Sequence, residues 1–374
     1  MRYFDHAATT PVLPQAAQAV GEAMLRFGNP SARYALGREA AGRLEDARQK
    51  VADALRCERG EVIFTSGGTE GDNWAVSAAK ARKKGHIITS AVEHSAVLEP
   101  VKALAQQGYE VTYLPVDAAG RVSPDDLSAA LREDTVLLSL MLVNNETGAV
   151  EPVAECVRRA KRFSGRIFCH TDAVQGFLKV PFTPRELGVD ALTISGHKIG
   201  APKGIGAMYL KKGGKLKPLI LGGGQEGGLR SGTESTVLAE GLAAAAEYGR
   251  AHLAEHTAAL SGLRDYAAAR LLAQVPRLQV VCRGEAPHIL AVTLPGYKSE
   301  VVVRFLSDRG ICVSSGSACH RGKPSHVYAA LGLPKPWLDG MLRVSFGPEN
   351  TAGDVDELAQ ALQAATEELF TTLS

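Results

Sequence analysis

The stretch "ALTISGHKIGAPKG" (residues 191–204) decides the fold class, because an apolar run leads directly into a lysine among glycines and a proline. Its first residues have the apolar and β-branched composition of a buried strand. The earlier stretch "RIFCHTD" (166–172) has a similar composition and ends in Asp172. Two such runs, each followed by polar side chains, indicate strands of one sheet with functional residues beyond their carboxyl ends.

Similar apolar runs occur throughout the first 212 residues, with helical patterns between most of them. They are "EVIFTS" (61–66), "HIITSA" (86–91), "EVTYLPV" (110–116), "TVLLSLMLV" (135–143) and "IGAMYLK" (205–211). Between two of them, "SPDDLSAALRE" (123–133) opens with a serine, a proline and two acids, which is typical of a helix start. This alternation predicts an α/β fold with a mostly parallel sheet flanked by helices.

The last third of the chain has a different pattern. Residues 234–273 are rich in Ala and Leu at helical spacing, which predicts one long helix or two. After them, residues 278–282 and 288–294 resemble short strands, and residues 299–310 and 352–370 resemble helices. We therefore expect a smaller α+β domain in addition to the larger α/β domain.

Bulk composition excludes several classes of protein. The 374 residues are 45% hydrophobic and 22% charged, with a formal net charge of +2, which favours neither nucleic acid nor an anionic membrane surface as a partner. No apolar run approaches the roughly 20 residues that span a bilayer, and the N-terminus lacks an apolar signal segment. Six scattered cysteines without a C-x-x-C pair indicate reduced thiols, and hence a cytoplasmic protein.

Lys198 and Asp172 together suggest a specific chemistry. A single lysine in a Gly-rich loop is often only a solvated side chain. However, a lysine that attaches a cofactor covalently, with an aspartate that keeps a pyridine nitrogen protonated, is what pyridoxal phosphate requires. Ser195 and His197 flank the lysine and are candidates to hold the phosphate.

Three further stretches carry candidate anion-binding groups, each with a purely structural alternative. In "FTSGGTEGDNWAV" (64–76), Gly67 and Gly68 precede a helix whose first N–H groups can bind phosphate, although an ordinary turn has the same pattern. "GGGQEGGLRSGTES" (222–235) offers Arg230 and Thr233, or is simply a flexible loop. "LRVSFG" (342–347) places Arg343 in a buried strand, where it needs a carboxylate or phosphate partner, or forms an internal salt bridge.

Cys319 lies in "GICVSSGSACHRGKPS" (310–325), a run of small and polar residues that predicts a mobile surface loop. Free cysteines are usually buried and inert, so an exposed one suggests a reactive thiol. The neighbouring His320 and Arg321 favour a lowered pKa for this thiol.

A competing pattern is "HLAEH" (252–256) on a predicted helix, in which His252 and His256 lie one turn apart. Two histidines at this spacing can bind zinc, and a zinc hydrolase is therefore an alternative. The surrounding stretch is Ala-rich and resembles a surface helix, so we expect no metal site here.

Taken together, the sequence resembles the cysteine desulfurases of the NifS/IscS type, in the class V branch of the aspartate-aminotransferase fold. The resemblance covers almost the whole chain, with its motifs in order. They are "YFDHAATTP" (3–11), "GNPSA" (28–32), "TSGGTEGDN" (65–73), "EHSAV" (93–97), "VNNETG" (143–148), "TDAVQ" (171–175), "SGHKIGAPKGIGA" (195–207), "RSGTES" (230–235), "SSGSAC" (314–319) and "LRVSFG".

This resemblance implies a role for each matching residue. Lys198 would hold pyridoxal 5′-phosphate and move the α-proton of the substrate, L-cysteine, and Cys319 would be the nucleophile that accepts its sulfur. Around the ring, Asp172 would pair with the pyridine nitrogen, Gln175 would contact the ring hydroxyl, and His94 would stack on the ring and transfer protons. The phosphate would be held by Gly68, Thr69, Ser195 and His197, together with Thr233 of a neighbouring subunit. The substrate carboxylate would be bound by Arg343, Asn145 and Asn29.

The resemblance also implies a homodimer, a sulfur-acceptor protein, and two domains. Residues 15–256 would form the large cofactor domain, and residues 1–14 with 257–374 the small domain that carries the cysteine loop. The sulfur would serve iron–sulfur clusters or the synthesis of thio-cofactors or thiolated tRNA. An aminotransferase or a selenocysteine lyase of the same class would share Lys198 and Asp172, and a non-catalytic cofactor-binding or sulfur-scaffold protein is a third possibility.

Overall fold

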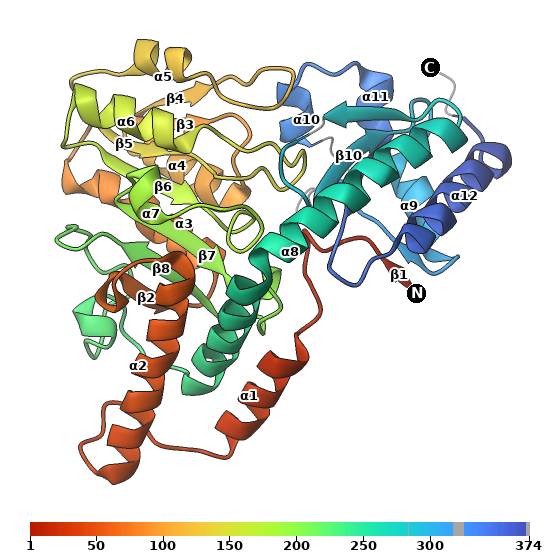
Figure 1. The fold of residues 1–374 in the computed structure, drawn as a ribbon. Coiled ribbons are helices and arrows are strands. Elements are labelled where there is room, and N and C mark those ends of the chain that lie inside the picture. The colour runs from red at the N-terminus through yellow and green to blue at the C-terminus, as the bar shows by residue number, and fades with distance from the viewer. Residues whose placement is uncertain (283, 317–324, 372–374) are drawn as a thin grey trace.

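A seven-stranded sheet forms the larger part of the protein (Figure 1). The computed structural model describes residues 1–282, 284–316 and 325–371. The strand order is β2–β8–β7–β6–β5–β3–β4, and all neighbours are parallel except the two pairs that include β8. The strands are β2 (Val62–Thr65), β3 (His86–Ser90), β4 (Glu110–Leu114), β5 (Thr135–Ser139), β6 (Phe168–Asp172), β7 (Ala191–Ser195) and β8 (Gly206–Leu210). The predicted α/β fold is confirmed.

One expected strand is shorter than its apolar run. The run 135–143 predicts a single strand, but β5 ends at Ser139. Beyond it, the N–H of Leu140 still donates to the carbonyl of His170 (3.1 Å), and that of Leu142 to the carbonyl of Asp172 (2.8 Å). Both leucines are buried. The apolar run therefore reports burial beside β6, and burial alone does not distinguish a strand from an irregular segment.

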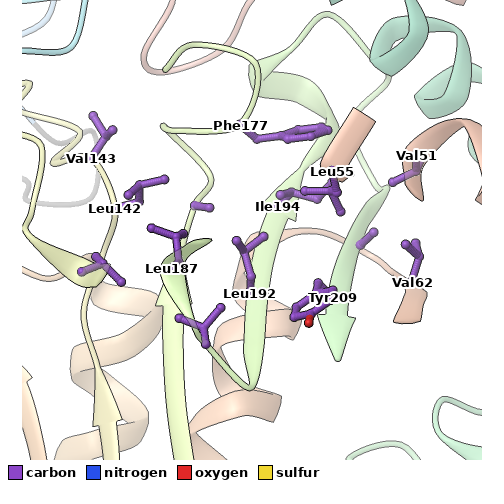
Figure 2. Close-up of a cluster of buried hydrophobic side chains, with 14 of the residues drawn as sticks. Val51, Leu55, Val62, Leu142, Val143, Phe177, Leu187, Leu192, Ile194 and Tyr209 are labelled. Carbon is purple, nitrogen blue, oxygen red and sulfur yellow. The ribbon is translucent and has the colours of Figure 1, made fainter. Parts of the chain in front are cut away.

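Helices cover this sheet and create its core. They are α1 (Pro14–Met24), α2 (Ala35–Leu55), α3 (Gly68–Val76), α4 (Ser95–Gln106), α5 (Pro124–Ala130), α6 (Val153–Phe163) and α7 (Pro184–Leu187). Figure 2 shows Val51 and Leu55 of α2 near Ile194 of β7 and Tyr209 of β8. As predicted, α5 begins after Ser123, whose hydroxyl accepts hydrogen bonds from the first turn of the helix.

A single long helix, α8 (Thr236–Gln274), runs through both halves of the molecule (Figure 1). α1 and α2 pack against its first half, and α12 (Ala352–Glu368) packs against its second half. Leu242 belongs to the core beneath the seven-stranded sheet, whereas Leu260 and Leu271 belong to a second hydrophobic core. The 39 residues therefore form one helix rather than two.

The second core lies beneath a smaller antiparallel sheet of order β12–β10–β9. Its elements are β9 (Gln279–Cys282), β10 (Ile289–Thr293), α9 (Ser299–Ser307), β11 (Ile311–Cys312), α10 (His326–Ala330), α11 (Lys335–Asp339), β12 (Met341–Ser345) and α12. The N-terminal strand β1 (Arg2–Tyr3) pairs in parallel with β11, and Phe4 is fully buried in this second core. No helix in the described ranges is long and apolar enough to cross a membrane.

Two adjacent leucines of α8 test the packing of the second core. Leu271 is 0% exposed and Leu272 is 41% exposed. We expect Leu271→Ala to lower the free energy of unfolding by about 2–5 kcal/mol, because it leaves a cavity in a packed core. The matched control Leu272→Ala should change it by less than about 0.5 kcal/mol. Urea denaturation measures both, and equal effects would contradict this description of the core.

Candidate active site

A cavity of about 250 Å³ lies beyond the carboxyl ends of the parallel strands, where open α/β sheets bind ligands. Segments that follow β2, β3, β5, β6 and β7 contribute to it, together with the N-terminal segment and β12. Its lining residues are Ala7, Ala8, Gly68, Thr69, Asp72, His94, Met141, Val143, Asn145, Asp172, Val174, Gln175, Ser195, His197, Lys198 and Arg343. Most of the residues singled out in the sequence therefore meet in one place.

Lys198 ends a short 3₁₀ turn that follows β7 directly. Its Nζ donates hydrogen bonds to the backbone carbonyls of Ala7 (2.7 Å) and Ala8 (2.8 Å). Gln175 Nε2 donates to the same carbonyl of Ala7 (2.8 Å). The N-terminal segment therefore orients the lysine and the glutamine together, which the sequence alone did not indicate.

Asp172 is the last residue of β6, and its carboxyl group is buried in the cavity. Its Oδ1 accepts a hydrogen bond from the N–H of Val174 (2.8 Å). Burial raises the pKa of Asp172, while His94, the Val174 N–H and Lys198 act in the opposite direction. A buried carboxylate of this kind fits a protonated pyridine nitrogen, which would supply the missing positive charge.

The turn between β2 and α3 fits a phosphate group. Gly67 has φ +149°, a conformation that side chains rarely allow, and a Cβ on Gly68 would come within 2.9 Å of Val174 Cγ2. The N–H groups at the start of α3 therefore border the cavity closely, beside Thr69 and Ser195. Burial, with Lys198 and Lys203, lowers the pKa of His197 to about 4, so that its ring is a neutral hydrogen-bonding group. The residues present fit pyridoxal 5′-phosphate.

His94 follows β3 and caps the N-terminus of α4 through its ring. The N–H of Ala96 donates to Nδ1 of His94 (3.1 Å). Because Nδ1 accepts this hydrogen bond, the neutral ring carries its proton on Nε2. The local helix cap therefore selects the tautomer of a side chain that lines the cavity.

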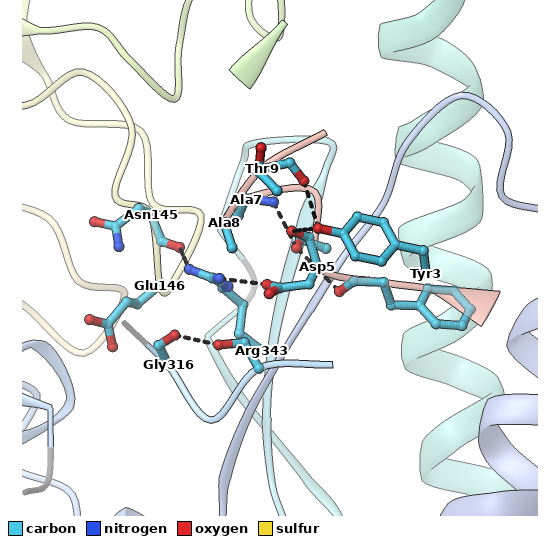
Figure 3. A network of polar contacts seen from close by, with 12 residues as sticks. Tyr3, Asp5, Ala7, Ala8, Thr9, Asn145, Glu146, Gly316 and Arg343 are labelled. Atoms are coloured by element: carbon cyan, nitrogen blue, oxygen red, sulfur yellow. Dashed lines mark hydrogen bonds and ion pairs between the residues drawn. The ribbon is translucent and has the colours of Figure 1, made fainter. Parts of the chain in front are cut away.

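Arg343 of β12 is 2% exposed and lies between two partners (Figure 3). Its Nη2 donates to Asp5 Oδ1 (2.7 Å), and its Nη1 donates to the backbone carbonyl of Asn145 (2.8 Å). Its Nε makes no hydrogen bond among the described residues. The expected internal salt bridge is thus present, and the guanidinium nevertheless lines the cavity and keeps one donor for an anion.

Two sequence-predicted site residues, Asn29 and Thr233, lie elsewhere in the described structure. Asn29 is exposed, and its Oδ1 accepts the N–H of Ser31 (2.9 Å). Thr233 is also exposed, in the loop before α8. Neither residue lines the cavity of this chain. Cys319 lies outside the described residues, as do His320 and Arg321.

Asp72 lines the cavity but was not assigned from the sequence. It lies in the quoted stretch "TSGGTEGDN", four residues after Gly68. Residues four apart share one face of a helix, and the Gly68 face of α3 was already expected to meet the cofactor. A buried acid on that face is the signal that could have identified it.

The two histidines of "HLAEH" lie on α8, as expected. The rings of His252 and His256 stack with their centroids 5.5 Å apart, and Nδ1 of His252 lies 2.9 Å from the carbonyl of Tyr248. Within the described part of the chain, no group of three or more His, Cys, Asp or Glu side chains is placed to hold a metal ion.

Burial separates the cysteines into two groups. It raises the pKa of Cys57, Cys156 and Cys169 to about 12 and that of Cys282 to about 11. Thiols with such pKa values contain almost no thiolate near neutral pH and are poor nucleophiles. Cys57 and Cys312 are both partly exposed. Because the pKa of Cys57 is raised, Cys312 and Cys319, which lies outside the described residues, are the remaining candidates for a reactive thiol.

Comparisons with known proteins cover nearly the whole chain. The family model of the class-V aminotransferases matches residues 2–358. A relative from Methanosarcina thermophila named cysteine desulfurase IscS is 43% identical over 377 residues, covering 98% of this chain and 92% of the relative. A solved structure described as a NifS-like protein has a TM-score of 0.93 at 35% identity, covering 99% of this chain and 100% of that one. Another, described as SspA in complex with cysteine, has a TM-score of 0.83 at 34% identity, covering 94% and 100%.

The difference in burial predicts which thiols react with iodoacetamide. In the folded protein near pH 7.5, we expect alkylation of Cys312 well before Cys156 or Cys169, because alkylation needs an accessible thiolate. We expect the same of Cys319 from the small and polar residues around it in the sequence. Peptide mass spectrometry after timed quenching identifies the modified residues. In urea all six cysteines should react, which is the control for accessibility. Alkylation of Cys156 at the rate of Cys312 in the folded protein would contradict the prediction.

Proposed function

The chain belongs to the class-V aminotransferase family, and within that family we propose that it is a cysteine desulfurase dependent on pyridoxal 5′-phosphate. It converts L-cysteine to L-alanine and keeps the sulfur as a persulfide. The observation that carries this proposal is the meeting of Lys198, Asp172 and Arg343 in one buried cavity. Relatives named cysteine desulfurase match nearly the full length of the chain, and one similar structure is described as a complex with cysteine.

The cofactor supplies an electron sink for the electron pair that remains when an α-proton is removed. Lys198 would hold it covalently, and Asp172 would keep its pyridine nitrogen protonated. Gln175 would bind the ring hydroxyl, and His94 would lie against the ring. The residues that bind the phosphate are Gly68, Thr69, Ser195 and His197, with Thr233 of a second subunit.

Lys198 moves the α-proton of the substrate. Its Nζ donates hydrogen bonds to the carbonyls of Ala7 and Ala8, which fix the position of the amine when it is not bonded to the cofactor. A positioned base costs little reorganisation at the moment of proton transfer. The Nε2 proton of His94 provides a second proton donor in the same cavity.

Arg343 binds the substrate carboxylate with the help of Asn145. Asp5 and the Asn145 carbonyl fix its guanidinium, while the Nε–H remains available among the described contacts. A fixed guanidinium orients a carboxylate better than a flexible ammonium. Asn29 lies outside the cavity of its own chain, so we assign it to the carboxylate site of the neighbouring subunit.

Cys319 is the nucleophile. Its thiolate Sγ forms a bond to the substrate sulfur while the Cβ–S bond of the substrate breaks. The electron pair of that bond returns to the carbon skeleton, which takes up protons and leaves as L-alanine. Cys319 then carries the persulfide and passes its outer sulfur to an acceptor thiol by exchange.

The protein acts as a homodimer with shared sites. Large apolar side chains are exposed at the end of α1 and just after it, where Met24, Leu25 and Phe27 are 69%, 84% and 86% exposed. Leu221 is 81% exposed in the loop that leads to Thr233. Large apolar side chains exposed close together support a protein interface. A second copy of the chain would also explain why Asn29 and Thr233 do not line the cavity of their own chain.

The loop that carries Thr233 is firmly anchored, which supports a role in recognition. Glu226 accepts two hydrogen bonds from the guanidinium of Arg48 (2.6 and 2.8 Å) and one from the N–H of Phe64 (2.9 Å). Arg230 forms a bidentate pair with Glu70, which lies on α3 beside the phosphate-binding turn (2.9 and 3.1 Å). Two fixed points on the chain's own fold thus orient the segment from Arg230 to Thr233.

We further propose two domains, residues 15–256 and residues 1–14 with 257–374, which correspond to the two hydrophobic cores joined by α8. The protein works in the cytoplasm and delivers sulfur to an acceptor protein for iron–sulfur clusters, thio-cofactors or tRNA. The alternatives predict other outcomes: an aminotransferase does not need Cys319, and a zinc hydrolase needs neither Lys198 nor a yellow cofactor.

Cys319→Ser tests the nucleophile. The variant should stay yellow and change its spectrum when L-cysteine is added, because Cys319 is not needed to bind the cofactor or the amino group. Alanine and sulfide production should fall to background, since a serine hydroxyl is almost never ionised near neutral pH. The matched control is Cys312→Ser, which should keep its activity.

Mass spectrometry of the wild-type protein complements this experiment. After L-cysteine is added without a reductant, one extra sulfur atom should be found on the peptide that contains Cys319. A persulfide on Cys312 would refute the choice of nucleophile but not the desulfurase activity. Near-normal alanine production by Cys319→Ser would refute the desulfurase mechanism itself.

Mixed dimers test the shared site. Lys198→Ala dimers should be inactive, and Thr233→Ala dimers should need excess cofactor. After subunit exchange, the Thr233→Ala chain keeps its own Lys198 and receives Thr233 from its partner. At limiting cofactor, an equal mixture should therefore recover about a quarter of wild-type turnover. If mixing restores no activity although exchange is confirmed by native mass spectrometry, Thr233 does not act across the interface.

A further inference from the structure

Asp72 is a buried carboxyl group to which the proposed mechanism gives no role. It lies on α3, is 1% exposed and lines the cavity together with Asp172. Its Oδ1 is fully covered and makes no hydrogen bond among the described residues. Burying a carboxylate without a compensating charge is costly, so this position needs an explanation.

The groups that face Asp72 come from β6, β7 and the segment after β3, and they do not supply a cation. From β6, Nε2 of His170 lies 3.6 Å from Asp72 Oδ1, and Asp172 adds a like charge. From β7, the hydroxyl of Thr193 faces the carboxyl group of Asp72 and lowers its pKa, which partly offsets the effect of burial. Glu93, which follows β3, is the remaining titratable neighbour; it is also an acid, and burial raises its pKa to about 8.

His170 does not act as that missing cation. Burial lowers its pKa to about 3, and its ring nitrogens lie 2.9 Å from Ser139 Oγ and 3.0 Å from Thr193 Oγ1. A neutral imidazole satisfies these two hydroxyl contacts without any charge. Among the described residues, no other basic side chain lies within 4 Å of the Asp72 carboxyl group.

We propose that Asp72 remains a protonated carboxylic acid in the working enzyme, so that Asp172 is the single negative charge offered to the pyridine nitrogen and Asp72 contributes a neutral hydrogen-bonding group beside it. Asp72 is thus a positioning residue of the cofactor site. This inference rests on the proposed function of Asp172 and deepens it.

The environments of Asp72 and Asp172 favour the protonated form for Asp72 and the ionised form for Asp172. Burial raises the pKa of Asp72 well above its usual range, and Asp172 raises it further. Asp172 is also buried, but His94, the Val174 N–H and Lys198 all favour its ionised form. Two acids in one buried site rarely ionise together, and the one whose neighbours favour its charged form, here Asp172 beside Lys198 and the Val174 N–H, ionises first. A protonated pyridine nitrogen beside Asp172 would increase this difference.

Asp72→Asn and Asp72→Leu distinguish the protonated form from the ionised form. Asparagine imitates a neutral carboxylic acid, so the cofactor dissociation constant of Asp72→Asn should stay within about threefold of wild type. Leucine has a similar size but no polar atoms, and the dissociation constant should rise about tenfold or more, equivalent to at least about 1.4 kcal/mol. A tenfold loss of affinity in a folded Asp72→Asn protein would overturn the proposal, as would an unchanged affinity in Asp72→Leu.

Infrared difference spectroscopy of the cofactor-loaded protein at pH 7 reads the proton directly, without turnover. Wild type minus Asp72→Asn should show the stretching band of a protonated carboxyl group, and wild type minus Asp172→Asn should not. If Asp72→Asn does not fold, wild-type protein with ¹³C-carboxyl aspartate provides the test, because its label shifts the band of a protonated aspartic acid. Absence of the band means that Asp72 is ionised and refutes the proposal.

Asp172→Asn separates this proposal from the proposed function. If that variant binds the cofactor as tightly as wild type, the role assigned to Asp172 is wrong, whatever Asp72 does. If it loses cofactor while Asp72→Asn keeps it, both assignments stand. If both variants lose cofactor to the same degree, the role of Asp172 survives and the neutral form of Asp72 does not.

Discussion

The hydrogen bonds from Lys198 to the carbonyls of Ala7 and Ala8 are the contacts on which the site depends. They join the loop after β7 to an N-terminal segment that is anchored in the other half of the molecule, through β1 and Phe4. The same short segment supplies the carboxylate of Asp5 to Arg343 and the acceptor for Gln175. The residues proposed to bind cofactor and substrate are therefore positioned by one short backbone segment. A displacement of that segment would disturb all of them together.

Charge in this cavity is controlled by burial together with a few close charged partners. Arg343 is balanced by Asp5, Asp172 faces Lys198 and His94, and His197 is kept neutral by burial and by its cationic neighbours. Each group thus has a protonation state that suits its proposed role before any ligand binds. Preorganised charges of this kind need little rearrangement during the reaction, which is the main electrostatic advantage of an enzyme over water.

The sequence predicted most of the fold, and the reasons are physical. Alternating strand and helix patterns reflect burial in a sheet with helices on its faces, so the strands that end at Asp172 and Ser195 could be located from composition. It also indicated which residues follow those strands, and most of them line the cavity. What it could not supply were the long-range contacts: the Ala7 and Ala8 carbonyls are backbone atoms with no residue signature, and the tautomer of His94 depends on the Ala96 N–H. The strand that was predicted to reach residue 143 ends at Ser139, because apolar side chains indicate burial and not the backbone hydrogen bonding of a strand.

The pairing of β1 with β11 has a consequence for biosynthesis. Arg2 and Tyr3 leave the ribosome before their partners Ile311 and Cys312, which follow roughly 300 residues later, about 15–60 s at ordinary rates of translation. The strands of the seven-stranded sheet all lie between residues 62 and 210, so that sheet can assemble on the ribosome well before then. Lys198 can therefore reach its final position in the sheet before the segment with Ala7 and Ala8 is fixed beside it. Arg2 and Tyr3 remain unpaired until the last third of the chain has been made. The wall of the cavity formed by Ala7 and Ala8 closes as one of the final events of folding, and only then is the pocket for the cofactor complete.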